Sequence, residues 1–104
     1  MRVALTCLLL LLPVCAEAAP KKQTFHNPSV NGLPIDACLS PNKDCGSLAA
    51  TKFCQDRKFG GATNHQIRRS DSDTFYQGSR GTCDQKKMGP CKRLAVVECS
   101  DFSL

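Results

Sequence analysis

Cysteine is the residue with the clearest chemical meaning in this 104-residue chain. Two of the eight cysteines, Cys7 and Cys15, lie in an apolar stretch at the N-terminus. The other six are Cys38, Cys45, Cys54, Cys83, Cys91 and Cys99. An even number of cysteines in a short exported chain predicts a disulfide framework, because the extracellular compartment is oxidising.

Six cysteines allow fifteen pairings, so spacing alone leaves the connectivity open. From geometry we predict three bonds: Cys54–Cys99, Cys83–Cys91 and Cys38–Cys45. The first would join the inner face of an expected helix to the last expected strand. The other two would close a lysine-rich loop and a turn.

The remaining titratable residues form no recognisable catalytic motif. His65 is the candidate base, with Asp71 and Asp73 nearby in sequence, but no serine lies in a G-x-S-x-G elbow. Asp36 and Asp44 flank a turn and are a weak candidate for a glycosidase-like pair.

Beyond the N-terminal stretch there is no C-x2-C pair and no histidine doublet, so we expect neither a metal site nor a cofactor. We favour a protein without enzymatic activity.

Basic residues are the other set that could carry function. The chain has 14 Lys and Arg against 9 Asp and Glu, a formal net charge of +5. The candidates for contact with an anionic partner are Arg68, Arg69, Arg80, Lys86, Lys87, Lys92 and Arg93. Such side chains could bind an anionic glycan, a cell wall or a membrane surface, whereas export argues against nucleic acid. Acidic residues are interspersed among them, so a solvated surface is the alternative interpretation.

The first eighteen residues have the three parts of a secretory signal. Met1-Arg2 supplies a positive start, residues 3–14 are almost wholly apolar, and Ala16-Glu17-Ala18 is a small-x-small site. The apolar run of about twelve residues is shorter than the roughly 20 that a membrane-spanning helix needs. We therefore predict a signal peptide at 1–18, with cleavage after Ala16 as the alternative, and a secreted, extracellular product.

Turn-forming residues suggest how the rest of the chain is divided. Asn27-Pro28 and Asn31-Gly32 predict a flexible N-terminal arm at 19–32. Residues 33–104 are expected to form one domain that disulfides stabilise, because so short a chain buries a modest core.

The clearest helix pattern covers about residues 46–58. Phe53 and Cys54 fall on its apolar face. Asp44 or Ser47 is expected to cap its first turn, and Gly60-Gly61 to end it with a left-handed residue.

The other periodic segments read as strands. Residues 62–69, 74–77 and 93–99 are β-prone, the last most strongly, and residues 33–39 read as an edge strand because of Pro34. Residues 86–90 read as a loop. The predicted fold class is small disulfide-rich α+β, with one helix packed on a short antiparallel sheet.

Several segments follow a pattern found elsewhere. They read P-I-D-A-C-L at 34–39, D-C-G at 44–46, A-A-T-K-F-C at 49–54 and F-G-G-A at 59–62. With Gly78 before Cys83 and a β-rich run ending in Cys99, they resemble a small secreted six-cysteine domain of plants and cyanobacteria. That pattern is P-I-D-x-C-L, N-C-G, A-A-x-x-F-C and G-[FY]-x-x-A, from which Asp44 and Lys43 depart. The resemblance covers about residues 33–100 and implies one six-cysteine domain, without implying an activity.

Export, three disulfides and a net charge of +5 favour a secreted basic protein that acts outside the cell by binding. A defence or toxin-like effector is the leading interpretation. One alternative is an extracellular matrix or cell-wall protein that binds acidic polysaccharide. Another is a secreted hydrolase or hydrolase inhibitor, in which residues 84–90 would be the inhibitory loop.

Overall fold

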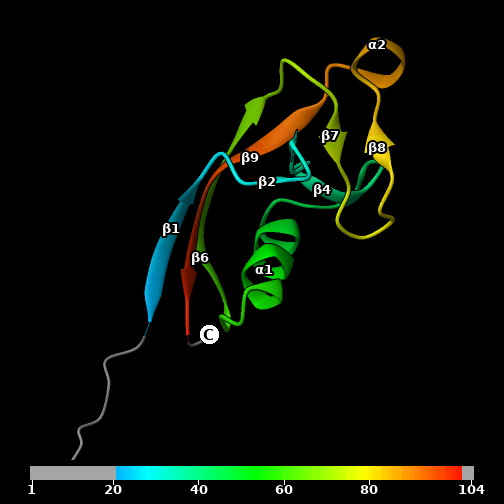
Figure 1. Ribbon diagram of the computed structural model, residues 1–104. Coiled ribbons are helices and arrows are strands. Elements are labelled where there is room, and N and C mark those ends of the chain that lie inside the picture. Colours follow the sequence, from blue (N-terminus) through cyan, green and yellow to red (C-terminus); the bar gives the residue numbers. More distant parts are fainter. Residues whose placement is uncertain (1–20, 102–104) are drawn as a thin grey trace, which may run out of the picture.

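A three-stranded antiparallel sheet forms one side of the molecule (Figure 1). The computed structural model describes residues 21–101. The sheet consists of β1 (Lys22–His26), β9 (Lys92–Ser100) and β6 (Gly61–Arg69), with β9 in the centre. Leu94 and Val97 of β9 are fully buried, which is the pattern of a central strand rich in aliphatic side chains.

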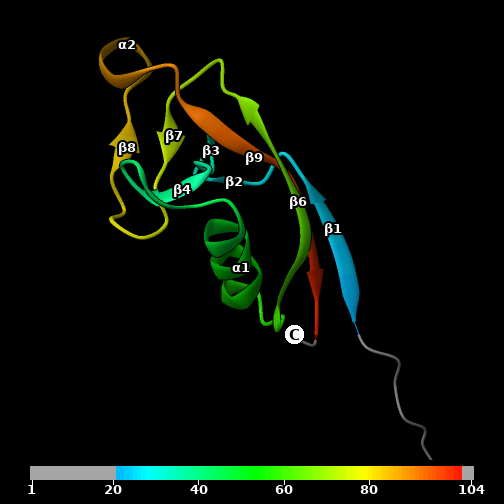
Figure 2. The ribbon, with the colours of Figure 1, turned by 180° about the vertical axis from the view of Figure 1, so that it is seen from behind.

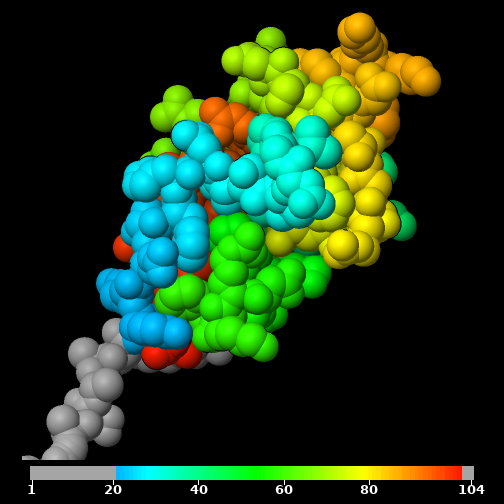
Figure 3. All heavy atoms as spheres, in the orientation of Figure 1, coloured from blue at the N-terminus to red at the C-terminus, as the bar shows by residue number. Residues whose placement is uncertain are grey.

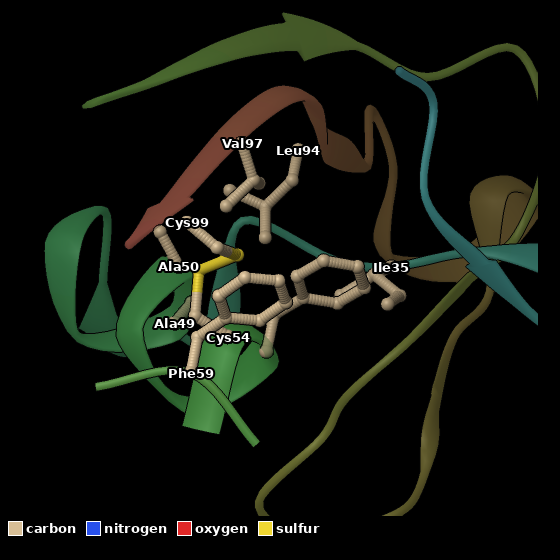
Figure 4. Close-up of a cluster of buried hydrophobic side chains, with 9 residues drawn as sticks. Ile35, Ala49, Ala50, Cys54, Phe59, Leu94, Val97 and Cys99 are labelled. Atoms are coloured by element: carbon tan, nitrogen blue, oxygen red, sulfur yellow. A yellow bond between two sulfur atoms is a disulfide. The ribbon is translucent and has the colours of Figure 1, made fainter. Parts of the chain in front are cut away.

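The helix α1 (Ser47–Asp56) lies beside β6 and β9 in both views of the ribbon (Figures 1 and 2). Its small residues Ala49 and Ala50 are buried, which lets the helix approach the sheet closely. Figure 4 shows the side chains of α1 and β9 pointing toward one another, with the Cys54–Cys99 disulfide between them. The buried core cluster consists of Ile35, Ala49, Ala50, Phe53, Cys54, Phe59, Leu94, Val97 and Cys99.

The ends of α1 differ from those predicted. The helix begins after Gly46, whose φ of 72° favours glycine, and no side chain caps it, so the expected caps Asp44 and Ser47 are wrong. The chain is held there by the Gly46 amide, which donates to the Ala37 carbonyl at 2.9 Å. At the other end Lys58, with φ of 73°, takes the left-handed conformation that was expected of Gly60 or Gly61.

Three short antiparallel ribbons and a second helix form the other end of the molecule. They are β2 (Ser29–Val30) with β3 (Leu33–Pro34), β4 (Cys38–Ser40) with β5 (Lys43–Cys45), β7 (Thr74–Phe75) with β8 (Thr82–Cys83), and α2 (Gln85–Met88). The loop predicted at residues 86–90 therefore contains a helical turn. Asp84 caps it, because its carboxylate accepts from the Lys86 amide at 2.9 Å.

The strand predicted at residues 33–39 is divided into β3 and β4. Between them the chain crosses two other elements. Ile35 forms a parallel bridge with Phe75, and Asp36 an antiparallel bridge with Arg93. This crossing segment joins the sheet to the ribbons, and Ile35 reaches the core from it.

Within the range 19–32, where a flexible arm is expected, the structure places two strands. β1 pairs along its whole length with β9, and β2 pairs with β3. The Phe25 ring packs edge-on against Phe53, with centroids 5.0 Å apart, so this strand adds to the core. In the space-filling view β1 (blue) covers the side of the molecule next to α1 (Figure 3). The predicted signal peptide at 1–18 lies outside the described residues.

All three predicted disulfides are confirmed. The structure has Cys38–Cys45, Cys54–Cys99 and Cys83–Cys91. The fold is small, disulfide-rich and composed mostly of strands, with two helices and small antiparallel sheets. The predicted single helix on a single sheet matches it only roughly, because α2 and the three ribbons were not expected. Three disulfides in so small a domain are consistent with an extracellular protein.

Candidate anion-binding site and adjoining cavity

Four of the predicted anion-binding residues meet at one end of the sheet. The antiparallel register places Arg68 opposite Arg93 and Arg69 opposite Lys92. We call these four residues the cation cluster. Side chains alternate between the faces of a strand, so each pair points to a different face of the β6–β9 ribbon.

Within residues 21–101 no acidic side chain forms a salt bridge with the cation cluster. Among residues 21–101 the one salt bridge joins Lys52 to Asp56, at 3.1 Å on the surface of α1. Arg93 instead donates through Nη1 to the side-chain oxygen of Asn27. Like charges directly opposite each other destabilise an antiparallel pair. The two like-charge pairs of the cation cluster are therefore expected to lower the free energy of unfolding.

The other three predicted residues are on segments other than β6 and β9. Lys86 and Lys87 are on α2, which projects from the same end of the molecule as the start of β9 (Figure 1). Lys86 borders a hollow that is also lined by Asp71, Asp73 and Asp84, so acidic groups offset its charge. Arg80 lies in the turn after β7, over the Phe75 ring with its Cζ 5.6 Å from the centroid, at the end of that ribbon away from α2.

A cavity of about 570 Å³ opens beside Lys92. Its walls include the Cys38–Cys45 disulfide, which links β4 to β5, and the Cys83–Cys91 disulfide, which links β8 to the segment before β9. The remaining lining residues are Asp36, Ala37, Asn42, Ile67, Tyr76, Met88, Pro90 and Lys92. Ile67 and Met88 are 40% and 48% exposed, and they are two of the three large apolar side chains left exposed in the described part of the chain.

Asp36 is a buried carboxyl in the wall of this cavity, only 4% exposed. One oxygen accepts from the Cys38 amide at 2.8 Å, and the other accepts from the Thr74 hydroxyl at 2.5 Å. Burial raises the pKa of Asp36 above its ordinary value of 3.8, and the two hydrogen bonds oppose this rise only in part.

Tyr76 is the second buried polar residue of the cavity, at 5% exposure. Its ring packs with Cys83 and Cys91. Burial and, secondarily, the negative charge of Asp36 raise the pKa of the Tyr76 phenol. The hydroxyl makes no hydrogen bond to any other residue within 21–101, and the side chain lines the cavity.

The weak catalytic candidates are not brought together. Asp36 is buried with both oxygens hydrogen-bonded to Cys38 and Thr74, whereas Asp44 is exposed. His65 lies beside the start of α1, with its Nε2 3.6 Å from the position that a Cβ on Gly46 would take. Asp73 follows the far end of β6, where it accepts from the Gln85 amide at 2.8 Å.

Two further features are lacking in the region that the structure describes. Residues 21–101 contain no group of three His, Cys, Asp or Glu side chains that could hold a metal ion. None of the helices within that range is long and apolar enough to cross a membrane.

Sequence reasoning missed the cavity and the roles of Asp36 and Tyr76. An aspartate two residues before a cysteine whose amide it binds is an Asx-turn, and D-A-C at 36–38 could have indicated it. Nothing in the sequence marks Tyr76, because the cavity forms between distant segments. Comparisons of the chain with protein-family models, curated proteins and solved structures give no match.

Proposed function

We propose that the protein is exported and acts outside the cell by binding an anionic polymer through the cation cluster. The observation that carries this proposal is the register of β6 against β9, which places four basic residues in two like-charge cross-strand pairs that form no salt bridge within residues 21–101. An anionic partner would turn this unfavourable arrangement into a favourable one. The apolar N-terminal stretch and the three disulfides support export.

Arginine suits this role because its planar guanidinium can donate two parallel hydrogen bonds to a carboxylate, sulfate or phosphate. The cluster contains three arginines and one lysine within two facing pairs. Because the pairs point to different faces of the ribbon, positive charge is available on both sides of the sheet end. This arrangement suits an extended polymer better than a single small anion.

We propose an acidic polysaccharide of a matrix or cell wall as the polymer. The cavity next to Lys92 contains the polar groups of Asp36, Asn42 and Tyr76, which suit sugar hydroxyls better than acyl chains. A defence or toxin-like effector and a matrix protein would both use this contact, and they differ in which cell carries the polymer.

The residues that carry the resemblance to the six-cysteine domain of plants and cyanobacteria are mainly structural. Ile35, Ala49, Ala50, Phe53 and Cys54 all lie in the core cluster. Membership of that group is therefore a proposal about the fold, and the cation cluster is a separate feature of this chain.

Salt-dependent retention on an immobilised acidic polysaccharide tests the proposal. Arg68→Gln/Arg69→Gln should elute from heparin at lower salt than the wild-type mature protein. The slope of log Kd against log salt should fall by about 1.5, taking for heparin the roughly 0.7–0.9 per cation that holds for nucleic acids. Lys22→Gln/Lys52→Gln removes the same charge elsewhere and should elute close to wild type.

Two results would contradict the proposal. If the wild-type protein passes through heparin at low salt, it does not bind such polymers. If both double variants lose retention equally, overall charge and not the cation cluster governs binding.

A further inference from the structure

We propose that the cavity beside Lys92 is a saccharide subsite that holds one unit of the acidic polymer. This inference rests on the proposed function, because it takes the ligand of the cavity to be part of the chain that the cation cluster binds. The cation cluster alone would distinguish ligands only by their charge. The subsite would add specificity for a sugar.

The cavity is held in shape before any ligand arrives. Its two disulfides fix the β4–β5 ribbon and the segment around α2. Ala37 donates its amide to the Lys92 carbonyl at 2.9 Å, and Cys91 donates its amide to Gln85 Oε1 at 2.8 Å. A pre-formed site loses little conformational entropy on binding, which favours affinity for a small ligand.

The Tyr76 hydroxyl in the cavity wall favours a ligand that carries hydrogen-bonding groups. The residue Tyr76 is 5% exposed and lines the cavity, and its hydroxyl has no hydrogen-bond partner in residues 21–101. A ligand that fills the cavity would exclude solvent from this hydroxyl, so a ligand hydroxyl is needed there as its hydrogen-bond partner. The Asp36 carboxyl and the Asn42 amide, in the same wall, can bond further sugar hydroxyls.

The rest of the lining matches the other parts of an acidic sugar. Lys92 provides a cation for a carboxylate or sulfate group. Ile67, Met88 and Pro90 provide apolar surface for the C–H face of a sugar ring. An acyl chain would cover these apolar groups but would leave Tyr76 and Asp36 without new partners. The combination therefore favours a saccharide over a lipid tail.

Tyrosine fluorescence gives a direct probe of this cavity. The chain has one tyrosine and no tryptophan, so the intrinsic emission comes from Tyr76. The mature protein is titrated with tetragalacturonate, a heparin-derived tetrasaccharide and inorganic polyphosphate. We expect a saturable fluorescence change with at least one of the saccharides and none with polyphosphate, which carries charge without sugar hydroxyls.

Two variants locate the binding by calorimetry. Tyr76→Phe keeps the ring and removes only the hydroxyl, so it should unfold at the temperature of the wild type or above it. Its affinity for the saccharide should fall by about five- to tenfold, the scale of one hydrogen bond, while polyphosphate affinity stays unchanged. Met88→Trp, at an exposed rim position, should block the cavity with the same selectivity and little effect on folding.

The possible failures separate the two proposals. Binding of polyphosphate with no saccharide-induced change in Tyr76 emission, or equal losses for both ligands, would overturn the saccharide subsite and leave the cation cluster in place. No binding of any of the three ligands would overturn the proposed function. A fluorescence change with anionic phospholipid vesicles but not with either saccharide would overturn the sugar assignment in favour of lipid.

Discussion

The Thr74 hydroxyl donates to the Asp36 carboxyl at 2.5 Å, and both residues are buried. This bond joins β7 to the crossing segment that carries Ile35 into the core. The carboxyl also fixes the start of β4 through the Cys38 amide. A single buried acid thus connects three parts of the domain.

We expect Asp36 to make the protein less stable as the pH rises above about 4. Burial raises its folded-state pKa above the ordinary value of 3.8, so the folded protein binds the proton more tightly than the unfolded chain does. The stability from this proton is complete below the unfolded pKa and is lost as the pH rises through the folded pKa. Asp36→Asn should flatten this part of the profile, measured by urea unfolding from pH 3 to pH 7. Exposed Asp44→Asn should retain it, and a wild-type profile in Asp36→Asn would contradict the assignment.

Gly78 should be intolerant of any side chain. A Cβ at this position would lie 2.7 Å from the Leu39 carbonyl oxygen, which also accepts the Gly78 amide at 2.8 Å. Gly78→Ala should therefore lower the free energy of unfolding by about 1–3 kcal/mol, as overpacking does. Gly81→Ala is the matched control, because its nearest neighbour outside the adjoining residues would be Ser79 Oγ at 3.6 Å. Similar thermal unfolding of the two variants would rule out the predicted clash.

The disulfides should contribute unequally to stability. Cys54–Cys99 joins residues 45 apart, whereas Cys38–Cys45 joins residues 7 apart. Loop entropy predicts losses of about 4 kcal/mol for Cys54→Ala/Cys99→Ala and about 2 kcal/mol for Cys38→Ala/Cys45→Ala. The first pair is also fully buried, so its removal opens space in the core. Chemical denaturation of both double variants checks this order, and a reversed order would contradict it.

The parts of the fold that could be predicted from sequence carry strong local patterns. The helix of α1 follows from the spacing of Phe53 and Cys54, and β9 follows from its run of aliphatic residues. Once these were placed, geometry favoured the correct Cys54–Cys99 bond. Strand β1 could not be predicted from a local pattern, because Phe25 is its one half-buried residue. Its partner β9 also lies some seventy positions further along the chain.

The candidate site could be predicted only as a set of residue types. The sequence shows the seven basic residues, but which of them meet depends on the register of β6 against β9. That register includes irregularities between Ala62 and Asn64 and between Gln66 and Ile67. Each such bulge changes which face the following side chains occupy, so the pairing of Arg68 with Arg93 could not be deduced from spacing.

Removal of one charge from a like-charge cross-strand pair should stabilise the free protein. Arg68→Gln removes one charge from the pair with Arg93 and should raise the free energy of unfolding by about 0.2–1 kcal/mol at low salt. The gain should shrink at 1 M salt, where exposed charges are screened. Lys22→Gln is the control for a change in net charge. A loss of stability in Arg68→Gln would show that the arginine is held by favourable contacts, which would weaken the case for an external anion.

Removal of the Phe25 ring distinguishes an integral first strand from a loose arm. The ring contacts Phe53 and Phe59, with centroid distances of 5.0 Å and 6.2 Å, and is half-buried. Phe25→Ala should cost about 2–3 kcal/mol in urea unfolding, somewhat less than the truncation of a fully buried phenylalanine. Gln23→Ala, at an exposed position of the same strand, should change stability by less than about 0.5 kcal/mol. A neutral Phe25→Ala would mean that residues 22–26 contribute little to the fold and behave as the arm that the sequence predicts.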